Sequence, residues 1–222
     1  MKRLLIVTAL ALVTLCGQFA LAEDLKLTTS GASTVLVVGS GGSVTYSNAN
    51  FGGWDIKIVF GDSNSPSLYP YGLDLSSVTA TCSNTPCTKN PLDIYLSDTG
   101  FTEKTNVFVN DYSATDTGKG STTQYAWDDT GNAMFGEGTP IGIVGPFNGS
   151  GVFSALAKGG GPAGPGAYSL TIEDIFTSPN KLGAGFSSDG DITAVTPEPV
   201  SMLLMGTFLS LAGGLLGKKK RA

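Results

Sequence analysis

Histidine is absent from all 222 residues of this chain. Histidine is the usual general base of serine and cysteine triads and the commonest zinc ligand, so its absence argues against both kinds of site. A pair of carboxylates could still hydrolyse glycosidic bonds. Glu137 and Glu173 lie deep enough in the chain to be considered, but no spacing singles them out. We therefore expect a protein without enzymatic activity and without a catalytic cofactor.

Cysteine is also scarce, with three residues at positions 16, 82 and 87. Cys16 falls in an N-terminal segment that we expect to be removed, which leaves Cys82 and Cys87 as a pair. Exported proteins fold in oxidising compartments where such pairs form disulfides. The spacing does not fit a two-residue redox motif, and no further soft ligand is available to complete a metal site. We therefore expect a structural disulfide between these two residues.

The N-terminus has the three parts of a secretory signal peptide. Lys2 and Arg3 give a short positive region, Leu4 to Leu15 form an apolar core, and Ala20-Leu21-Ala22 offers small residues around a cleavage site. The sequence therefore predicts a signal peptide over residues 1–22, with Glu23 as the first residue of the exported chain.

The C-terminus combines a Pro197-Glu198-Pro199 tripeptide, an apolar run from Val200 to Leu216 and a basic end. The run would form a helix of about 25 Å, slightly short of a hydrocarbon core of roughly 30 Å. Basic residues resist translocation and would hold the end of the chain in the cytoplasm, with everything before Pro197 outside. The basic residues are Lys218, Lys219, Lys220 and Arg221.

This C-terminal arrangement resembles the PEP-CTERM sorting signal of Gram-negative bacteria, over residues 197–222. In that family the tail is a temporary anchor, processed near the tripeptide by an exosortase in species that make exopolysaccharide. Thr196 departs slightly from the family pattern, as do the lysines where arginine is more usual. The resemblance implies an exosortase and membrane lipid as transient partners, and a final location at the cell surface or outside the cell. An ordinary anchor that is never cut has the same hydropathy and stays open.

Residues 23–196 remain as one exported domain. They hold seven basic and seventeen acidic residues, a formal charge of −10. Nucleic acids and anionic lipids would be repelled by such a domain, and we expect neither as a partner.

Apolar residues alternate with polar ones along this domain, which is typical of half-buried β-strands. In Trp54 to Phe60, residues 54, 56, 58 and 60 are predicted to share one apolar face. Turn residues separate the strands, Gly159–Gly166 is predicted to be a loop, and no long amphipathic helix is found. We expect an antiparallel β-sandwich of jelly-roll type. The other predicted strands cover residues 34–38, 44–47, 73–82, 92–96, 106–109, 122–127, 152–157, 168–172 and 185–195.

The tripeptide Asp-Thr-Gly occurs three times, beginning at Asp98, Asp116 and Asp129. Two such aspartates sharing a proton form the active site of aspartic proteases. The residues around these copies do not fit that family, and Asp followed closely by Gly is typical of a turn. We therefore expect three turns.

Calcium is the ion that exported β-sandwiches with many aspartates would most readily bind, through carboxylate and carbonyl oxygens. The best local candidates are Asp189 with Asp191 and Asp111 with Asp116, but neither pair has the ordered ligand pattern of an EF-hand, and solvated turn residues are the preferred interpretation. We keep structural calcium as a weak prediction.

Trp127 stands between the predicted strand at 122–127 and a turn, and we expect its ring to be exposed enough to contact a sugar. Trp54 should instead pack in the core. Two functional hypotheses follow. The first is a non-enzymatic surface or matrix protein associated with exopolysaccharide or biofilm, and the alternative is a carbohydrate-binding module of the same fold. A polysaccharide hydrolase ranks third.

Overall fold

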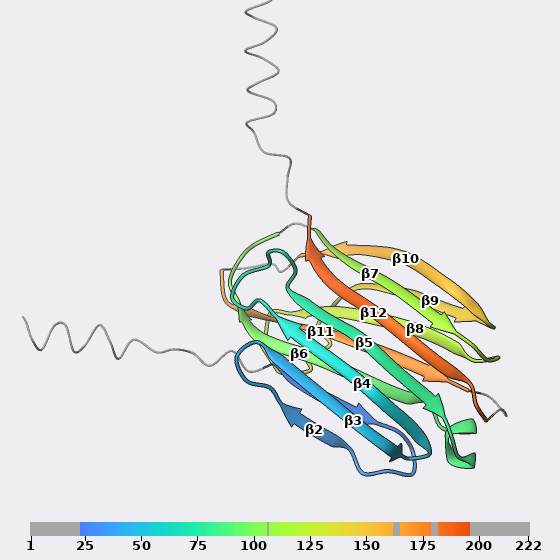
Figure 1. Ribbon diagram of the computed structural model, residues 1–222. Coiled ribbons are helices and arrows are strands. Elements are labelled where there is room, and N and C mark those ends of the chain that lie inside the picture. The colour runs from blue at the N-terminus through green and yellow to red at the C-terminus, as the bar shows by residue number, and fades with distance from the viewer. Residues whose placement is uncertain (1–22, 106, 162–164, 179–181, 196–222) are drawn as a thin grey trace, which may run out of the picture.

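Two six-stranded antiparallel sheets lie face to face in the computed structural model (Figure 1), which describes residues 23–105, 107–161, 165–178 and 182–195. We call them sheet A, with strand order β2-β1-β6-β11-β8-β9, and sheet B, with order β10-β7-β12-β5-β4-β3. Neighbouring strands such as β6 and β11 come from distant parts of the chain, as in jelly-roll sandwiches. The prediction of an antiparallel β-sandwich is confirmed.

The strands of sheet A are β1 (Asp24–Thr28), β2 (Val35–Val38), β6 (Leu92–Phe101), β8 (Ser121–Asp129), β9 (Thr139–Asn148) and β11 (Tyr168–Thr177). The strands of sheet B are β3 (Ser43–Phe51), β4 (Trp54–Ser63), β5 (Leu73–Cys82), β7 (Val107–Asp116), β10 (Gly151–Gly160) and β12 (Gly185–Ala194). A single 3-10 turn, η1 (Thr85–Thr88), is the one helical element within the described residues.

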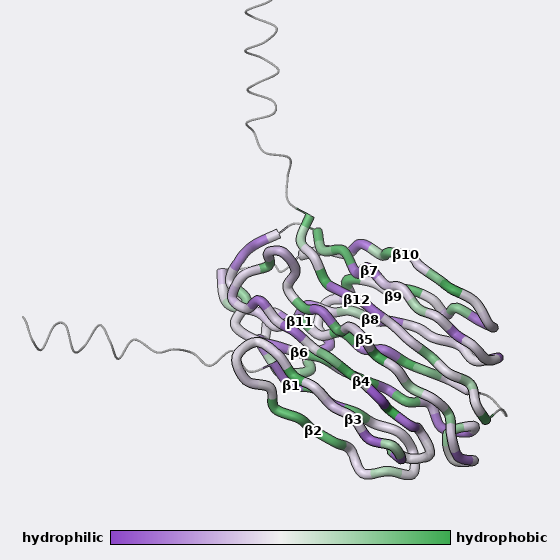
Figure 2. Tube along the Cα trace, in the orientation of Figure 1, coloured by the Kyte–Doolittle hydropathy of each residue, from purple (hydrophilic) through white to green (hydrophobic). Residues whose placement is uncertain are grey.

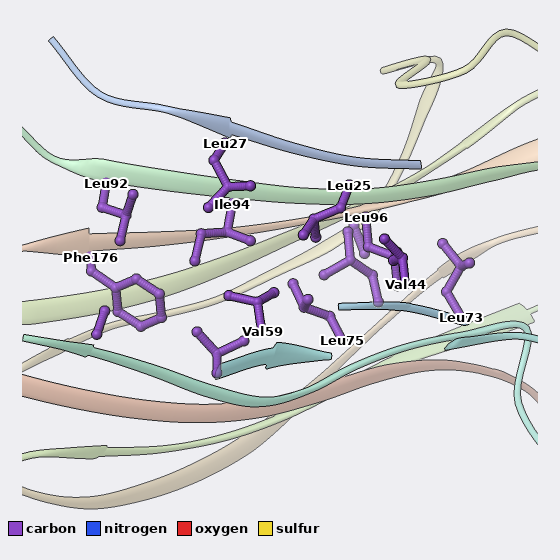
Figure 3. Packing of buried hydrophobic residues seen from close by; sticks show 14 of the residues in the cluster. Leu25, Leu27, Val44, Val59, Leu73, Leu75, Leu92, Ile94, Leu96 and Phe176 are labelled. Atoms are coloured by element: carbon purple, nitrogen blue, oxygen red, sulfur yellow. The ribbon is translucent and has the colours of Figure 1, made fainter. Parts of the chain in front are cut away.

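Alternating residues of the two sheets fill the space between them. Side chains of sheet A point toward those of sheet B in Figure 3: Leu25, Leu27, Leu92 and Leu96 on one side, and Val44, Val59, Leu73 and Leu75 on the other. All of these are buried. Trp54 belongs to the same core with no exposed surface, so the prediction for this residue is confirmed.

The predicted face of β4 is right at Trp54 and Ile56 and wrong at Phe60. The register between β4 and β5 shifts at two points, between Ile56 and Ile58 and between Ile58 and Phe60. A bulge adds a residue to one strand and turns the following side chains to the other face. Val59 is therefore buried and Phe60 only half-buried. The resulting mixture of hydrophobic and hydrophilic residues along β4 can be followed in Figure 2.

Sequence patterns missed β1 and β9, and Gly159 and Gly160, predicted to lie in a loop, end β10. β9 carries Pro140 and Pro146, residues that usually mark turns. It lies at the edge of sheet A, where a proline need not donate a hydrogen bond to a neighbouring strand.

The predicted disulfide between Cys82 and Cys87 is confirmed, with a Cα–Cα distance of 5.5 Å. It closes a short loop that contains η1 and joins the end of β5 to the chain leading into β6. Both cysteines are buried, at 0% and 1% exposed.

Two of the three Asp-Thr-Gly segments are turns, as predicted. Asp116 accepts hydrogen bonds from the backbone N–H groups of Gly118 (2.6 Å) and Gly120 (3.1 Å), and Asp129 accepts one from Gly131 (2.8 Å). The first copy is not a turn: Asp98 lies within β6 and is buried.

The predicted signal peptide over residues 1–22 and the predicted sorting signal over residues 197–222 lie outside the described residues. Among the residues that the structure describes, no helix is long and apolar enough to cross a membrane.

Candidate functional site

The outward surface of sheet A brings together side chains from five adjacent strands, and we call it the outer A face. Strand register arranges these residues in three rows across the sheet. The central row is Lys26, Tyr95, Glu173, Tyr125 and Ile143; the rows on either side are Ser97, Thr171, Trp127 and Pro140, and Thr28, Asp93, Ile175 and Thr123.

An aromatic pair stands on β8 within this face. Tyr125 and Trp127 are two residues apart, so both side chains project from the same side of the strand. Their ring centroids are 5.6 Å apart and their planes differ by 6°, which makes them a stacked pair. Both rings keep part of their surface exposed. Ile143, opposite Tyr125 on the edge strand β9, is 55% exposed and extends the apolar surface.

The connection from β8 to β9 lies across the face on one side of this pair. The Ser169 hydroxyl of β11 donates to the carbonyl of Ala133 (2.7 Å), and the N–H of Phe135 donates to the Ser97 hydroxyl of β6 (2.9 Å). The connection therefore spans three strands and is held by side chains of two of them. Phe135 adopts a positive φ of 56°, which changes the direction of the chain at this residue.

Phe135 completes a second group of rings on the face. Its ring meets Tyr95 edge to face, with centroids 6.4 Å apart and planes at 84°. The Lys26 ammonium lies 3.7 Å from the Tyr95 ring centroid and 4.6 Å from that of Phe135. A cation between two ring faces is an attractive arrangement, and here both partners come from the protein itself.

Carboxyl groups lie between the two ring groups. Burial raises the pKa of Glu173, its hydrogen bond with Tyr95 lowers it, and the charges of Asp93 and Glu137 raise it further. The pKa of Asp93 is also raised, mainly by burial, although the Thr28 hydroxyl donates to it at 3.1 Å. The structure thus brings Glu137 and Glu173, the two glutamates considered from the sequence, within electrostatic range of each other.

Partly exposed rings flanked by hydroxyl and carboxyl groups suit a ligand with apolar faces and many hydroxyls. Aromatic rings supply contact area, while carboxylates accept and hydroxyls both donate and accept hydrogen bonds. Trp127 is half-exposed on the outward side of β8, within the strand and not at its end, and its contact with a sugar stays a prediction. The sequence considered Glu173 only as a catalytic carboxylate and did not pair Tyr125 with Trp127, although their two-residue spacing within one strand was a signal for that pair.

The predicted calcium ligands lie on the other sheet. Asp111 and Asp191 are directly opposite each other on β7 and β12, and the row continues through Asp74 on β5 to Asp62 on β4. We call these four residues the acidic row. Asp189 lies two positions from Asp191 on the same strand.

Asp116 does not join the acidic row, because it is buried on the inward side of β7 whereas Asp111 is exposed on the outward side. Burial together with the charges of Asp111, Asp74 and Asp189 raises the pKa of Asp191 to about 6. Within the described parts of the chain, no group of three or more acidic or cysteine side chains is arranged to hold a metal ion. Calcium stays a prediction.

The inward face of the sandwich also contains a polar link between the sheets. Asp174 of β11 is fully buried and accepts hydrogen bonds from the Gln124 side-chain amide (2.9 Å) and the Ser188 hydroxyl (2.6 Å). Burial raises the pKa of Asp174 to about 7, although both hydrogen bonds lower it.

No family model and no curated protein matches the sequence. Among solved structures, the chain is similar to the enzymatically active domain of bacteriophage CBA120 tailspike protein 4, with 12% identity and a TM-score of 0.36 over 77% of this chain. The match spans 19% of the tailspike chain.

Carbohydrate-binding modules are also among the similar structures. One is TmCBM61 in complex with β-1,4-galactotriose (7% identity, TM-score 0.34, 77% of this chain and 88% of that one). Another is the family 11 module of the cellulosomal cellulase Lic26A-Cel5E of Clostridium thermocellum (12% identity, TM-score 0.33, 72% of this chain and 92% of that one). Likenesses this distant carry no argument about what the outer A face binds.

Proposed function

We propose that this domain is a non-enzymatic carbohydrate-binding protein and that it holds polysaccharide on the outer A face. The observation that carries the proposal is the stacked pair of Tyr125 and Trp127, partly exposed on the outward surface of sheet A, one strand from its edge. Large rings at outward positions of a sheet are not needed for the core, which lies on the opposite side. They provide the apolar surface against which a sugar ring can pack.

Polar groups beside the pair supply hydrogen bonds for sugar hydroxyls. Glu173, the register partner of Tyr125, keeps 8% of its surface exposed, and Glu137 on the connection from β8 to β9 is exposed within electrostatic range of it. Thr171, the register partner of Trp127, is fully buried and hydrogen-bonded with Ser97, so it supports the face from beneath. A small number of fixed polar groups beside aromatic contact area is the usual composition of a specific ligand site.

The charge of the domain restricts the class of sugar. A formal charge of −10 over residues 23–196, with Glu173, Glu137 and Asp93 close to the rings, disfavours polymers rich in uronic acids or sulfate. Neutral polysaccharides carry no such penalty. We therefore expect neutral glycans to bind more tightly than polyanionic ones.

The cellular setting rests on the two ends of the chain. We propose that residues 1–22 direct export and that an exosortase processes the chain near Pro197-Glu198-Pro199, leaving the domain at the surface or in an exopolysaccharide matrix. The intact mass of the protein in its host tests this step. A mass ending near Pro197 in the surface or medium fraction supports processing, and full-length protein in the inner membrane contradicts it.

Binding is tested with the purified chain on gels containing the host's own polysaccharide, or xylan, mannan or β-1,4-galactan as neutral probes. Trp127→Ala should weaken binding roughly thirtyfold, a loss of about 2 kcal/mol. Tyr69→Ala is the matched control, because Tyr69 is 78% exposed and lies in the connection between β4 and β5. An equal melting temperature of the two variants excludes a folding defect.

Two outcomes would contradict the proposal. Unchanged retention of Trp127→Ala would remove the outer A face as the binding surface. New reducing ends released from the probe by the wild-type chain, and lost in Glu173→Gln, would instead support the hydrolase hypothesis.

A further inference from the structure

A carboxyl group without a partner is enclosed at the start of β1. Glu23 is fully buried, and neither of its carboxylate oxygens has a hydrogen-bond partner. The Glu23 carbonyl accepts a hydrogen bond from the N–H of Gly39 (2.8 Å). Gly39 packs so closely against the Glu23 carboxylate that a side chain at position 39 would collide with it. A buried polar group held in this way normally has a partner.

A second buried carboxyl lies on the neighbouring strand. Asp24 pairs with Ser97, so Glu23 lies opposite Asp98 at the next step of the register. Asp98 is 2% exposed, and it accepts hydrogen bonds from the Ser63 hydroxyl (2.6 Å) and the Thr99 N–H (2.6 Å). Both acids occupy the inward series of positions that their strands continue with leucines. We call Glu23 and Asp98 the carboxyl pair.

The charges around the pair are negative. Burial raises the pKa of Glu23 to about 7, and the charges of Asp98, Asp62 and Asp24 raise it further. The backbone nitrogen of Glu23 belongs to the same residue as one of the acids, and the strand register places this residue opposite the other. A positive charge on this nitrogen would therefore lie near both acids.

We propose that the carboxyl pair binds the α-ammonium group of Glu23, which is created when the predicted signal peptide is removed. The proposal rests on cleavage after Ala22 and is independent of the proposed polysaccharide binding. A signal peptidase adds the hydroxyl of a water molecule to the Ala22 carbonyl carbon and a proton to the Glu23 nitrogen. The new Ala22 carboxyl group gives its proton to the new amine, which leaves a carboxylate on the released peptide and an ammonium on the domain.

Processing would then complete the folded domain. Before cleavage the Glu23 nitrogen is a neutral amide, so no positive charge offsets the repulsion between the two buried carboxyl groups. After cleavage the same nitrogen carries a positive charge without any movement of the strand. An α-amino group ordinarily has a pKa of about 7.7 to 8.0, and two adjacent carboxylates raise that pKa further.

The test compares two purified chains in detergent: residues 23–222, and the same chain with Gly-Ser placed before Glu23. Both have the same net charge, but the second carries its ammonium group two residues away from the pair. At pH 6.5 we expect the chain that begins at Glu23 to melt about 4 °C higher. The pairing needs a protonated amine and an ionised carboxylate. The difference therefore disappears as the pH rises through the folded-state pKa of the amine, and it also shrinks as the pH falls and the carboxyl pair becomes protonated.

Reactivity of the amine gives a second measurement. An amine-directed acylating reagent at pH 7.5 should modify the α-amine of the chain that begins at Glu23 roughly tenfold more slowly than that of the extended chain, which corresponds to one pKa unit. Asp98→Asn should lower the melting temperature of the former and leave unchanged or raise that of the latter. If Asp98→Asn does not fold, the acylation rates of the two unsubstituted chains still test the proposal.

Equal melting temperatures and equal acylation rates would overturn the proposal. A rise in melting temperature with Ca²⁺ in both chains that Asp98→Asn abolishes would also overturn it, because a metal ion would then be the partner of the carboxyl pair.

Discussion

Single buried carboxyl groups determine much of the chemistry of this domain. Asp174 joins the two sheets, since it accepts from Gln124 in sheet A and from Ser188 in sheet B. Sequence patterns could not reveal it: Asp174 follows Ile172 by two positions and continues an inward series that otherwise holds apolar residues. From the sequence alone, an aspartate at this position suggests that the side chain points to solvent. Only the hydrogen-bond donors on β8 and β12 explain why it can be buried.

Asp174→Ala is expected to lower the free energy of unfolding by about 2 kcal/mol, because the Gln124 amide is left buried without an acceptor. Asp174→Asn should cost much less, since its side-chain oxygen can accept from Gln124 while its amide donates to the Ser188 hydroxyl. Urea unfolding at pH 7 measures both. Equal losses in the two variants would mean that packing, and not the hydrogen bonds, is what matters at this position.

Elements at the edges and ends of the sheets depart most from what the sequence predicts. The pattern finds the central strands β5 and β12 over their full length and β11 over its first half, residues 168–172. β9 is interrupted by Pro140, Gly142 and Pro146, and its identity as a strand depends on pairing with β8. The bulges in β4 are likewise set by its partner β5, because register is a property of two strands. The same limit applies to the outer A face. Trp127 could be proposed from the alternation in its own strand, whereas, apart from Tyr125, the residues around it come from four other strands.

The disulfide acts at the scale of one element, by restraining the chain between β5 and β6. Replacing both cysteines, as in Cys82→Ala with Cys87→Ala, should lower the free energy of unfolding by about 2 kcal/mol, the loop-closure entropy of so short a loop. Chemical unfolding of the oxidised wild type and the double variant measures the difference. Since both cysteines are buried, reductant alone should act slowly on the folded protein. A double variant as stable as the wild type would show that η1 is held by its own hydrogen bonds.

Across the whole molecule, acidic groups outnumber the cations that could pair with them. The acidic row places four aspartates side by side on sheet B, and the outer A face holds three more carboxyl groups around a single lysine of β1. Such an arrangement makes the folded state of the domain favour protonation. Stability should therefore respond to pH in the direction opposite to that of proteins whose carboxylates are paired with cations.

The melting temperature is expected to rise as the pH falls from 7.5 to 5. The pKa values of Asp74, Asp128 and Asp191 are raised to about 6 and that of Asp174 to about 7, from an ordinary 3.8, with burial as the main cause. Between these limits the folded state binds more protons than the unfolded state, so stability falls as the pH rises. Asp74→Asn combined with Asp191→Asn should flatten this profile and raise the melting temperature at pH 7.5. Asp55→Asn on β4, outside the acidic row, is the control and should leave the slope unchanged. A wild-type profile that is flat, or that rises toward pH 7.5, would mean that cations from solution already neutralise these groups in the folded protein.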